Sequence, residues 1–254
     1  MTTMVNDLSQ DENGQMSQTD VVVYGIKRMI LDGELAPGDK LPIEKDLAPK
    51  LGVSRGSLRE GVRALSIMGV LETRQGAGMF VTSLDASLLL APMGFVVDLQ
   101  EHSGVHHVHS VRRTLETDAA ARAALRVTDD DLAVASEILD RAERAIEERD
   151  HEAVIEADMQ FHRVIAEAAG NPVLAALIEA LSSRTLRGRM WRSIRDEHAD
   201  AATAKEHRAI LRALSEHDPQ AAQIRMSNHL LEVEEFLQER PPVDADLSDS
   251  SDQS

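Results

Sequence analysis

The stretch Leu51–Leu65, LGVSRGSLREGVRAL, constrains the fold of this chain more than any other. Gly52 predicts a tight turn, and Ser54 can cap the free N–H groups that begin a following helix. The apolar positions of that helix recur at i, i+4 and i+7, at Leu58, Val62 and Leu65. Its first turns carry the polar side chains Arg55, Ser57 and Arg59. A helix that packs on one side and presents arginines near its N-terminal end has the layout of a DNA recognition helix.

The segments on either side complete a small domain. Residues 20–32 show helical spacing and stop at Gly33, and Ile43–Leu51 reads as a second helix. After the third helix, which Gly69 ends, residues 70–74 and 79–82 alternate as strands do, with a glycine-rich turn between them. Three helices followed by a two-stranded ribbon predict a winged helix-turn-helix over residues 19–82.

The charge of the chain is unevenly distributed. The formal net charge of −17 at pH 7 by itself argues against a nucleic-acid partner. Residues 19–82, however, hold nine Lys and Arg against eight Asp and Glu, a net charge of +1, so the remainder carries −18. The acidic excess therefore lies outside the candidate DNA-binding domain. The charge distribution, rather than the net charge, is what matters for a nucleic-acid partner, and it does not exclude one.

Composition excludes several classes of protein. The chain has no cysteine, which rules out disulfides and thiolate metal sites. The N-terminal segment is polar and acidic and lacks the apolar region of a signal peptide. The most apolar stretch, residues 84–99, contains two aspartates and is too short to span a bilayer. We expect a cytoplasmic protein that associates with the nucleoid by binding DNA and has no membrane partner.

Beyond residue 83 the pattern changes to long helical segments without strand signals. Aromatic residues make up only 2% of the chain, so the core must consist of Ala, Leu, Ile, Val and Met, which favours helices. We expect a linker over residues 83–87 and an all-helical bundle over residues 88–240. Residues 1–18 and the acidic tail 241–254 are expected to be disordered. The predicted fold class is mostly α, with an N-terminal winged helix-turn-helix and a C-terminal helical bundle.

Start signals place the helices of the bundle. Thr128 with Asp131, and Thr203 with Glu206, resemble capping boxes, and prolines follow Asn171 and Asp218 at first helical positions. The resulting helices are Leu88–Leu99, His102–Leu125, Thr128–Glu148, Glu152–Ala169, one from Pro172 to about His198, one from Thr203 to about His217, and one from Pro219 that ends before Pro241.

All ten histidines fall in this helical part, and three lie on the apolar stripes of different helices. His162 lies on one stripe with Asp158 one turn before it, so the two side chains meet on one face. His207 and His229 lie on the stripes of the last two helices. Burying these four side chains requires a shared partner or separate hydrogen bonds. The spacing leaves two interpretations open: separate core histidines, or a site for a divalent metal such as zinc, nickel, manganese or iron, with zinc favoured.

Two further tracts are candidates for function. His102–His109 competes for the metal, because His102 and His106 are one helical turn apart, but the tract has no carboxylate of its own. We expect it to have a surface or interface role. The arginines of Arg184–Arg195 form a basic band, which we interpret as solvated or at an interface.

Residues 38–81, GDKLPIEKDLAPKLGVSRGSLREGVRALSIMGVLETRQGAGMFV, resemble the N-terminal domain of the GntR family of bacterial transcription regulators. The combination of PGDKLP, LGVSR, LRE and a Gly-x-Gly wing carries the resemblance. It implies that arginines of the third helix contact base edges and phosphates, that Lys45 holds the DNA backbone, and that the wing enters the minor groove. The implied DNA-binding residues are Lys45, Ser54, Arg55, Ser57, Arg59, Gln75, Gly76 and Gly78. Many members have arginine where this chain has Lys45, and lysine lacks the bidentate fork.

Residues 98–239 resemble the FCD domain of the FadR-type subfamily, a helical ligand-binding domain, most specifically in the string ADMQFHRVIAEAAGNPVL. Metal-binding members show Asp-x-x-x-His followed by a histidine on each of two later helices. The resemblance therefore implies a metal site of Asp158, His162, His207 and His229. In the matching subfamily an arginine at the Arg112 position points into the effector cavity, where it would bind a carboxylate. The alternative for Arg112 is an ordinary helical ion pair with the glutamate at position 116.

Together these observations predict a DNA-binding transcription regulator, with repression as the expected sign. A homodimer would bind double-stranded DNA at a short inverted repeat. A small organic or sugar acid, bound at the metal and Arg112, would shift the population of its conformations. Two alternatives remain: a purely structural metal without an effector, and a metal-dependent hydrolase fused to a DNA-binding module. The chain lacks the H-E-x-x-H motif that supplies a general base beside a metal, so we predict no enzyme.

Overall fold

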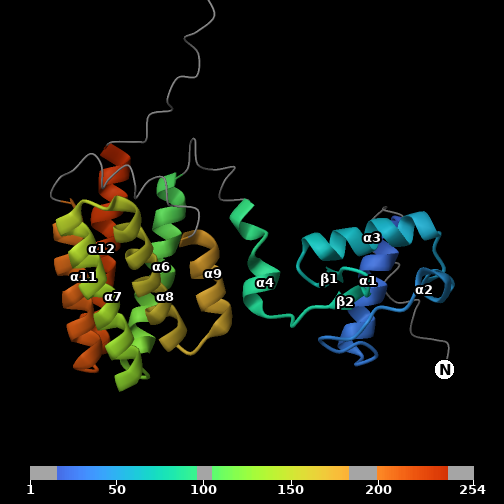
Figure 1. The fold of residues 1–254 in the computed structure, drawn as a ribbon, viewed down its shortest axis with the longest axis horizontal. Coiled ribbons are helices and arrows are strands. Elements are labelled where there is room, and N and C mark those ends of the chain that lie inside the picture. Colours follow the sequence, from blue (N-terminus) through green and yellow to red (C-terminus); the bar gives the residue numbers. More distant parts are fainter. Residues whose placement is uncertain (1–15, 96–104, 183–198, 240–254) are drawn as a thin grey trace, which may run out of the picture. The chain divides into compact units, whose positions relative to one another are not determined.

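The computed structural model of the 254-residue chain describes residues 16–95, 105–182 and 199–239. The chain divides into two compact units, Met1–Leu89 and Leu90–Ser254. Helices dominate both units (Figure 1), and the only strands among the described residues form one small hairpin. The predicted fold class, a winged helix-turn-helix followed by a helical bundle, is confirmed.

The N-terminal unit has the order helix, helix, helix, hairpin, short helix. Its elements are α1 (Gln18–Leu31), α2 (Glu44–Leu51), α3 (Arg55–Ile67), β1 (Leu71–Arg74), β2 (Gly78–Val81) and α4 (Ala86–Leu90). The strands pair antiparallel with Leu71 opposite Val81, and Lys40 adds an isolated bridge to Phe80. The hairpin is the predicted wing; it packs against α3, and the bridge joins it to the connector between α1 and α2.

The turn that opens α3 forms as the sequence predicts. Gly52 has a φ of 69°, a left-handed conformation that glycine adopts without steric strain. The Ser54 hydroxyl accepts a hydrogen bond from the Ser57 N–H at 3.1 Å and so caps the helix. The apolar face of α3 is buried through Leu58 and Leu65. These contacts leave the exposed face of α3 free to carry its arginines.

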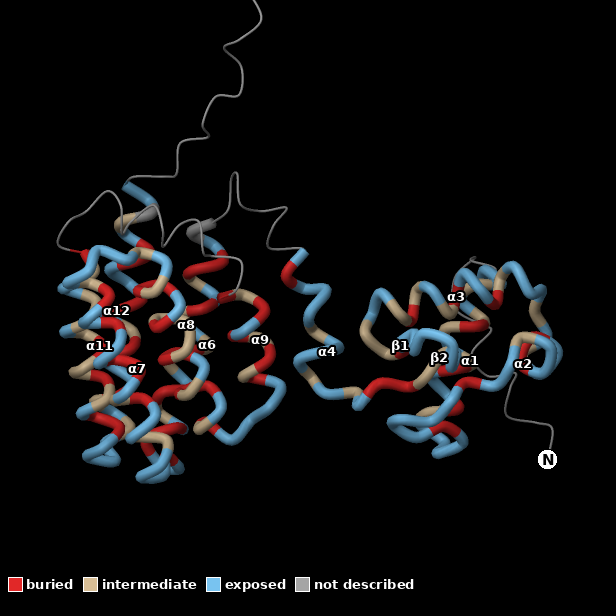
Figure 2. Tube along the Cα trace, viewed as in Figure 1, coloured by how far each residue is buried: buried red, intermediate tan, exposed pale blue. Residues whose placement is uncertain are grey.

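The helical unit is built from α6 (Val105–Ala124), α7 (Asp129–Glu148), α8 (His151–Ala168), α9 (Pro172–Ser182), α11 (Ala199–Ser215) and α12 (Pro219–Glu239). Helix α6 packs against α12, α8 and α9, while α7 packs against α8 and α11. The buried alanines of α6 let neighbouring helices approach closely; they are Ala119, Ala120, Ala123 and Ala124. In Figure 2 buried positions recur at intervals along these helices, as amphipathic helices require.

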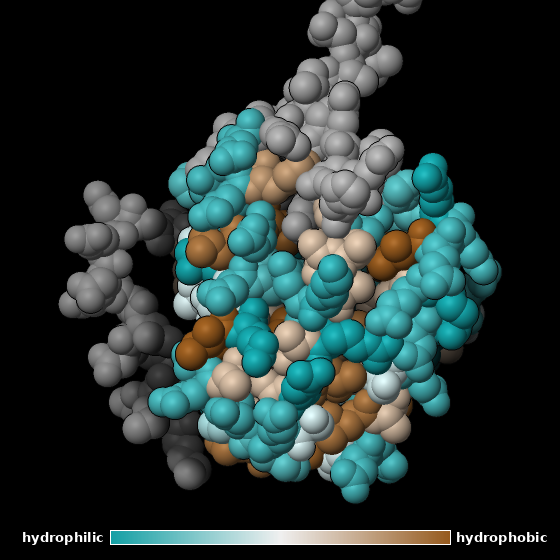
Figure 3. Space-filling model, turned by 90° about the vertical axis from the view of Figure 1, so that its left-hand side faces the viewer, coloured by the Kyte–Doolittle hydropathy of each residue, from teal (hydrophilic) through white to brown (hydrophobic). Residues whose placement is uncertain are grey.

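One face of the helical unit is mainly polar. Figure 3 shows this face, where hydrophilic side chains cover most of the view and hydrophobic ones lie in small separate patches. None of the described helices combines the length and the apolar character needed to cross a membrane.

Most of the predicted helix starts are confirmed. The capping box at Thr128 forms with Asp131, and the side chains of Asn171 and Asp218 accept hydrogen bonds from the first turns of α9 and α12. Helix α12 ends at Glu239, before Pro241.

Three predicted boundaries are wrong. Helix α11 begins at Ala199 rather than Thr203, because the alanine-rich turn before Thr203 is itself a strong helix former. Helix α4 covers only Ala86–Leu90, so no continuous helix runs from Leu88 through Pro92. Helix α1 takes in Gln18, the last residue of the segment expected to be disordered, because Ser17 caps it with a reciprocal bond to Asp20.

Several predictions lie outside the described residues. They concern the disorder of residues 1–15, the helical register of residues 96–104, the continuation of α9 and the basic band within residues 183–198, and the acidic tail 241–254.

Gly61 tests the packing of α3 against α1. A Cβ at Gly61 would lie 2.5 Å from two atoms of the fully buried Val22 and 3.2 Å from the backbone oxygen of Thr19. We expect Gly61→Ala to destabilise the N-terminal unit by about 1–3 kcal/mol through overpacking, measured by thermal unfolding. Gly56→Ala is the control, because its Cβ would meet only the Ser54 hydroxyl at 3.7 Å. Equal melting temperatures for the two variants would contradict this account of the packing.

Candidate metal centre and DNA-binding surface

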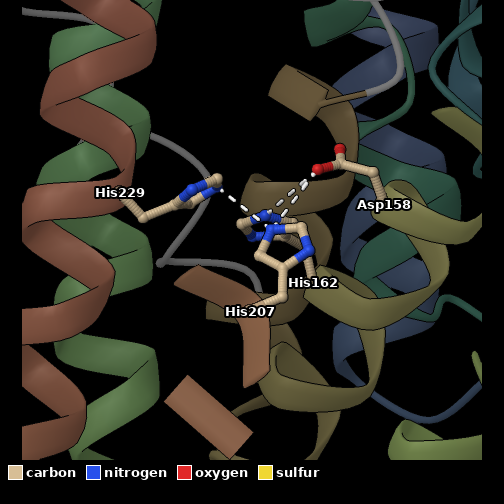
Figure 4. Close-up of side chains that lie close together, drawn as sticks. All are labelled: Asp158, His162, His207 and His229. Atoms are coloured by element: carbon tan, nitrogen blue, oxygen red, sulfur yellow. Dashed lines mark hydrogen bonds and ion pairs between the residues drawn. The ribbon is translucent and has the colours of Figure 1, made fainter. Parts of the chain in front are cut away.

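Three helices of the bundle bring four potential metal ligands together. Asp158 and His162 come from α8, His207 from α11 and His229 from α12 (Figure 4). One ligand atom from each residue lies within 4.8 Å of all the others. The Nε2 atoms of His207 and His229 are 3.2 Å apart, and the Oδ1 of Asp158 lies 3.5 Å from His207 Nε2 and 3.8 Å from His162 Nε2. The arrangement could hold a metal ion.

The cluster lies inside the helical unit. All three imidazoles are buried, and Asp158 is partly buried. The ring of Phe161 lies against His207 with a centroid separation of 4.7 Å. The Nε2 of His162 is buried and makes no hydrogen bond within the described part of the chain. A buried imidazole nitrogen without a hydrogen bond is costly, and a metal at this point would satisfy it.

Two carboxylates hold the histidines from outside. The Nδ1 of His229 lies 2.7 Å from the Glu206 carboxylate, and the Nδ1 of His162 is hydrogen-bonded to Glu116. When Nδ1 donates its proton to a carboxylate, Nε2 keeps its lone pair and faces the ligand position. Such pairs fix the tautomer and ring orientation of metal-binding histidines.

The charges of this region favour a divalent cation. Metal ligation requires neutral imidazoles. The carboxylates of Asp158, Glu116 and Glu206 contact the histidines. Asp200 lines a cavity beside the cluster, where Arg112 is the described positive side chain. This excess of negative charge attracts a cation.

Burial also prepares His229 for ligation. It lowers the pKa of His229 below the ordinary value of 6.5, although the hydrogen bond to Glu206 acts in the opposite direction. The ring is therefore neutral at neutral pH, the form that binds a metal. Because this pKa is lowered, the folded state loses stability as the pH falls below the ordinary histidine value, where the unfolded chain binds a proton that the folded ring does not.

Arg112 forms the helical ion pair that the sequence left as one alternative, and it also lies beside the cluster. It is only 1% exposed and forms an ion pair with Glu116 at 2.8 Å, the same carboxylate that holds His162. It also lines a cavity of about 50 Å³ beside Asp158, His162 and His229. The helical ion pair is thus present, and the arginine borders the cluster as well.

The predicted surface tract divides between exposed and buried positions. His107 is exposed, whereas His109 is buried within the helical unit. A surface role therefore does not hold for His109, because the face of α6 that carries it packs inside the bundle. Among the described residues, the tract forms no cluster of potential metal ligands.

The predicted DNA-binding residues lie on α2, α3 and the wing. Arg55, Arg59 and Lys45 are exposed, while Ser54 and Ser57 share the N-terminal cap of α3. Gln75 and Gly76 lie in the exposed turn between β1 and β2, and Gly78 begins β2. Gly76 and Gly78 have φ values of 72° and 113°, which favour glycine and permit the tight turn at the wing tip.

One contact on this surface was not predicted from the sequence. Glu44, at the start of α2, accepts hydrogen bonds from Arg59 at 2.7 and 2.9 Å. The hydrogen bond with Arg59 lowers the pKa of Glu44, so the pair is fully charged at neutral pH.

Sequence reasoning also missed the contacts of Glu116 with His162 and of Glu206 with His229. It treated Glu116 as a partner of Arg112 only and Glu206 as a capping residue. For Glu206 no local signal existed, because His229 lies on another helix. For Glu116 a signal was present, since an acidic residue on a buried stripe requires more than one partner.

A winged helix-turn-helix followed by a helical unit with a buried His and Asp cluster is the architecture of a DNA-binding transcription regulator. Residues 18–81 match the model of the bacterial regulatory proteins of the gntR family, and residues 107–232 match the FCD domain. The chain belongs to the GntR family and carries a C-terminal FCD domain.

Relatives of known annotation agree with this assignment. The chain is 32% identical over 223 residues to the Uxu operon transcriptional regulator of Escherichia coli K12, covering 86% of each chain. It is 28% identical over 234 residues to the HTH-type transcriptional repressor NanR of Klebsiella aerogenes, covering 91% of this chain and 89% of the relative. A solved GntR structure from Streptococcus agalactiae has a TM-score of 0.64 at 28% identity, covering 85% of this chain and 99% of that one. These relatives are regulators and not enzymes, as the sequence predicted.

Metal affinity tests the cluster and its outer carboxylates. We expect His207→Ala to lose bound zinc on dialysis and Glu206→Gln to bind zinc roughly 10- to 100-fold more weakly, because the His229 ring loses its orienting partner. Elemental analysis and a competition titration measure both effects. The controls are His107→Ala and Glu232→Gln, exposed residues on α6 and α12. Unchanged zinc binding in His207→Ala would place the site elsewhere.

Proposed function

We propose that this regulator is a repressor whose affinity for its operator is set by a small carboxylate effector at a metal centre in the helical domain. It acts as a homodimer on a short inverted repeat of double-stranded DNA. The metal is zinc, nickel, manganese or iron, with zinc favoured by the Asp and three-His ligand set. The protein works in the cytoplasm, associated with the nucleoid.

The observation that carries the metal part is the shared orientation of the histidines. Asp158 and the three imidazole Nε2 atoms lie within 4.8 Å of one another, and two rings are held from behind by Glu116 and Glu206. The competing interpretation, separate core histidines, leaves the buried Nε2 of His162 without a hydrogen bond among the described residues, whereas a metal ion would use it. The ligands we propose are Asp158, His162, His207 and His229.

The acid effector is supported by Arg112. Its guanidinium borders the same cavity as three of the proposed ligands, so one acid could bind both the metal and the arginine. The cavity, at about 50 Å³, is much smaller than the roughly 300–1,000 Å³ of ordinary ligand pockets. An organic or sugar acid therefore binds only when the walls move apart. That requirement provides a route from effector binding to a population shift.

The DNA-binding part rests on the exposed arginines of α3 and on the wing. We propose that Arg55 and Arg59 contact the major groove and that Lys45 contacts a phosphate. Ser54 and Ser57, at the N-terminal end of α3, lie toward the DNA backbone. Gln75, Gly76 and Gly78 bring the wing to the minor groove. The DNA-binding domain spans residues 19–82, and residues 83–87 link it to the effector and dimerisation domain of residues 88–240.

The sequence left two alternatives to this proposal, a fused hydrolase and a purely structural metal. The fused hydrolase is disfavoured, because the relatives are transcription regulators. A purely structural metal remains the competitor, since a metal that only locks α8, α11 and α12 needs no acid.

Arg59→Ala tests the DNA surface. We expect at least a tenfold loss of operator affinity, measured by fluorescence anisotropy, because a charged major-groove contact is removed. Zinc content should not change, since the two units have separate cores. Arg28→Ala is the control, because Arg28 is exposed on α1 and pairs only with Asp32 among the contacts described. Equal affinities for both variants would exclude Arg59 from the DNA contact.

A thermal-shift screen tests the effector. We expect an acid at 100 times its Kd to stabilise the zinc-loaded protein by about 2.7 kcal/mol, and to have no such effect after zinc is removed. Arg112→Lys keeps a charge beside Glu116 but loses the bidentate fork, so it should weaken this response. If zinc raises the melting temperature and no hydroxy, keto or sugar acid raises it further, the structural-metal alternative is the better account.

A further inference from the structure

Arg59 on the recognition helix has an acidic partner on the neighbouring helix. Glu44, the first residue of α2, accepts a hydrogen bond from Arg59 Nε at 2.7 Å and another from Nη2 at 2.9 Å. Both residues line a groove of about 630 Å³ that also includes Lys40 and Gly78. The pair therefore lies beside the wing, within the surface proposed to meet DNA.

A carboxylate at this position requires a physical reason. It repels the phosphate backbone and weakens binding to DNA of any sequence. Its ion pair contributes little to stability, because the Glu44 and Arg59 side chains are 42% and 70% exposed. Since Glu44 adds neither DNA affinity nor much stability, we take its role to be the orientation of the Arg59 side chain.

The geometry leaves one edge of the guanidinium for DNA. Arginine carries five N–H groups in a planar fork, and Glu44 engages Nε and one N–H of Nη2. The edge formed by Nη1 and the second N–H of Nη2 points away from this carboxylate. Within the described ranges no other hydrogen bond engages that edge. Two N–H groups on one edge match the O6 and N7 acceptors of guanine in the major groove.

We propose that Glu44 is a positioning residue that holds Arg59 to read one guanine in each half-site of the operator. The carboxylate fixes the plane of the fork, so that bidentate contact with guanine forms without a further loss of side-chain freedom. A base without two acceptors on this edge leaves Arg59 unsatisfied. The inference rests on the proposed contact between Arg59 and DNA.

Selection from a randomised DNA duplex library, read by sequencing, tests the inference with the full chain. The wild-type protein should select guanine at one position of each half-site. Glu44→Gln should reduce that preference by about ten- to a hundredfold and leave the preferences at other positions intact. The matched control is Asp46→Asn, which removes the same charge from the same exposed turn of α2 and should keep every preference.

Arg59→Lys tests the pair from the other side. It keeps the positive charge but lacks the planar fork, so it should lose the same guanine preference even if Glu44→Gln folds poorly. The inference is overturned if Glu44→Gln folds and keeps the preference, if it weakens all positions alike, or if Arg59→Lys retains the guanine. If Arg59→Ala bound the operator as tightly as the wild-type protein, the proposed contact between Arg59 and DNA would be wrong. That result differs from a failure of the Glu44 inference alone.

Discussion

The burial of three imidazoles at the junction of α8, α11 and α12 is the constraint on which the helical unit depends. Their nitrogens cannot all be satisfied by apolar neighbours, and an unsatisfied buried nitrogen is costly. The bundle provides polar partners on two sides of the rings. Glu116 and Glu206 hold the outward nitrogens of His162 and His229, and the inward nitrogens converge with Asp158. The same geometry that satisfies the rings also creates a place for a cation.

The two units use carboxylates in the same way at very different depths. In the helical unit Glu116 is buried and joins Arg112 to His162. In the N-terminal unit Glu44 is exposed and holds Arg59. In each case an acidic side chain from a neighbouring helix fixes the direction of a group for which we propose a binding role. The energetic value of such a contact lies in pre-organisation of the binding group.

Local signals predicted the elements wherever a cap or a turn glycine dominates. Gly52, Ser54 and the box at Thr128 formed as expected, because each acts within one helical turn. The box at Thr203 did not, although it too has an acidic residue three positions after the threonine. The alanines before it extend α11 to Ala199, and Glu206 turns instead to His229 on α12. A capping signal can be overridden when helix propensity continues through it and a tertiary partner is available for the glutamate.

The sequence alone determined the two-part architecture, the recognition helix with its wing, and the four residues of the candidate metal cluster. The architecture and the recognition helix follow from periodicity and helix signals, which a linear chain displays. Spacing placed the histidines on apolar stripes, and the resemblance to the FCD domain implied that they form a metal site with Asp158. Only the tertiary structure decided which carboxylates orient the histidines, that Arg112 both pairs with Glu116 and borders the cavity, and that Glu44 reaches Arg59. Glu206 and Glu44 each contact a residue on another helix. How the helices pack decides these partners, and the spacing of residues along the chain does not reveal that packing.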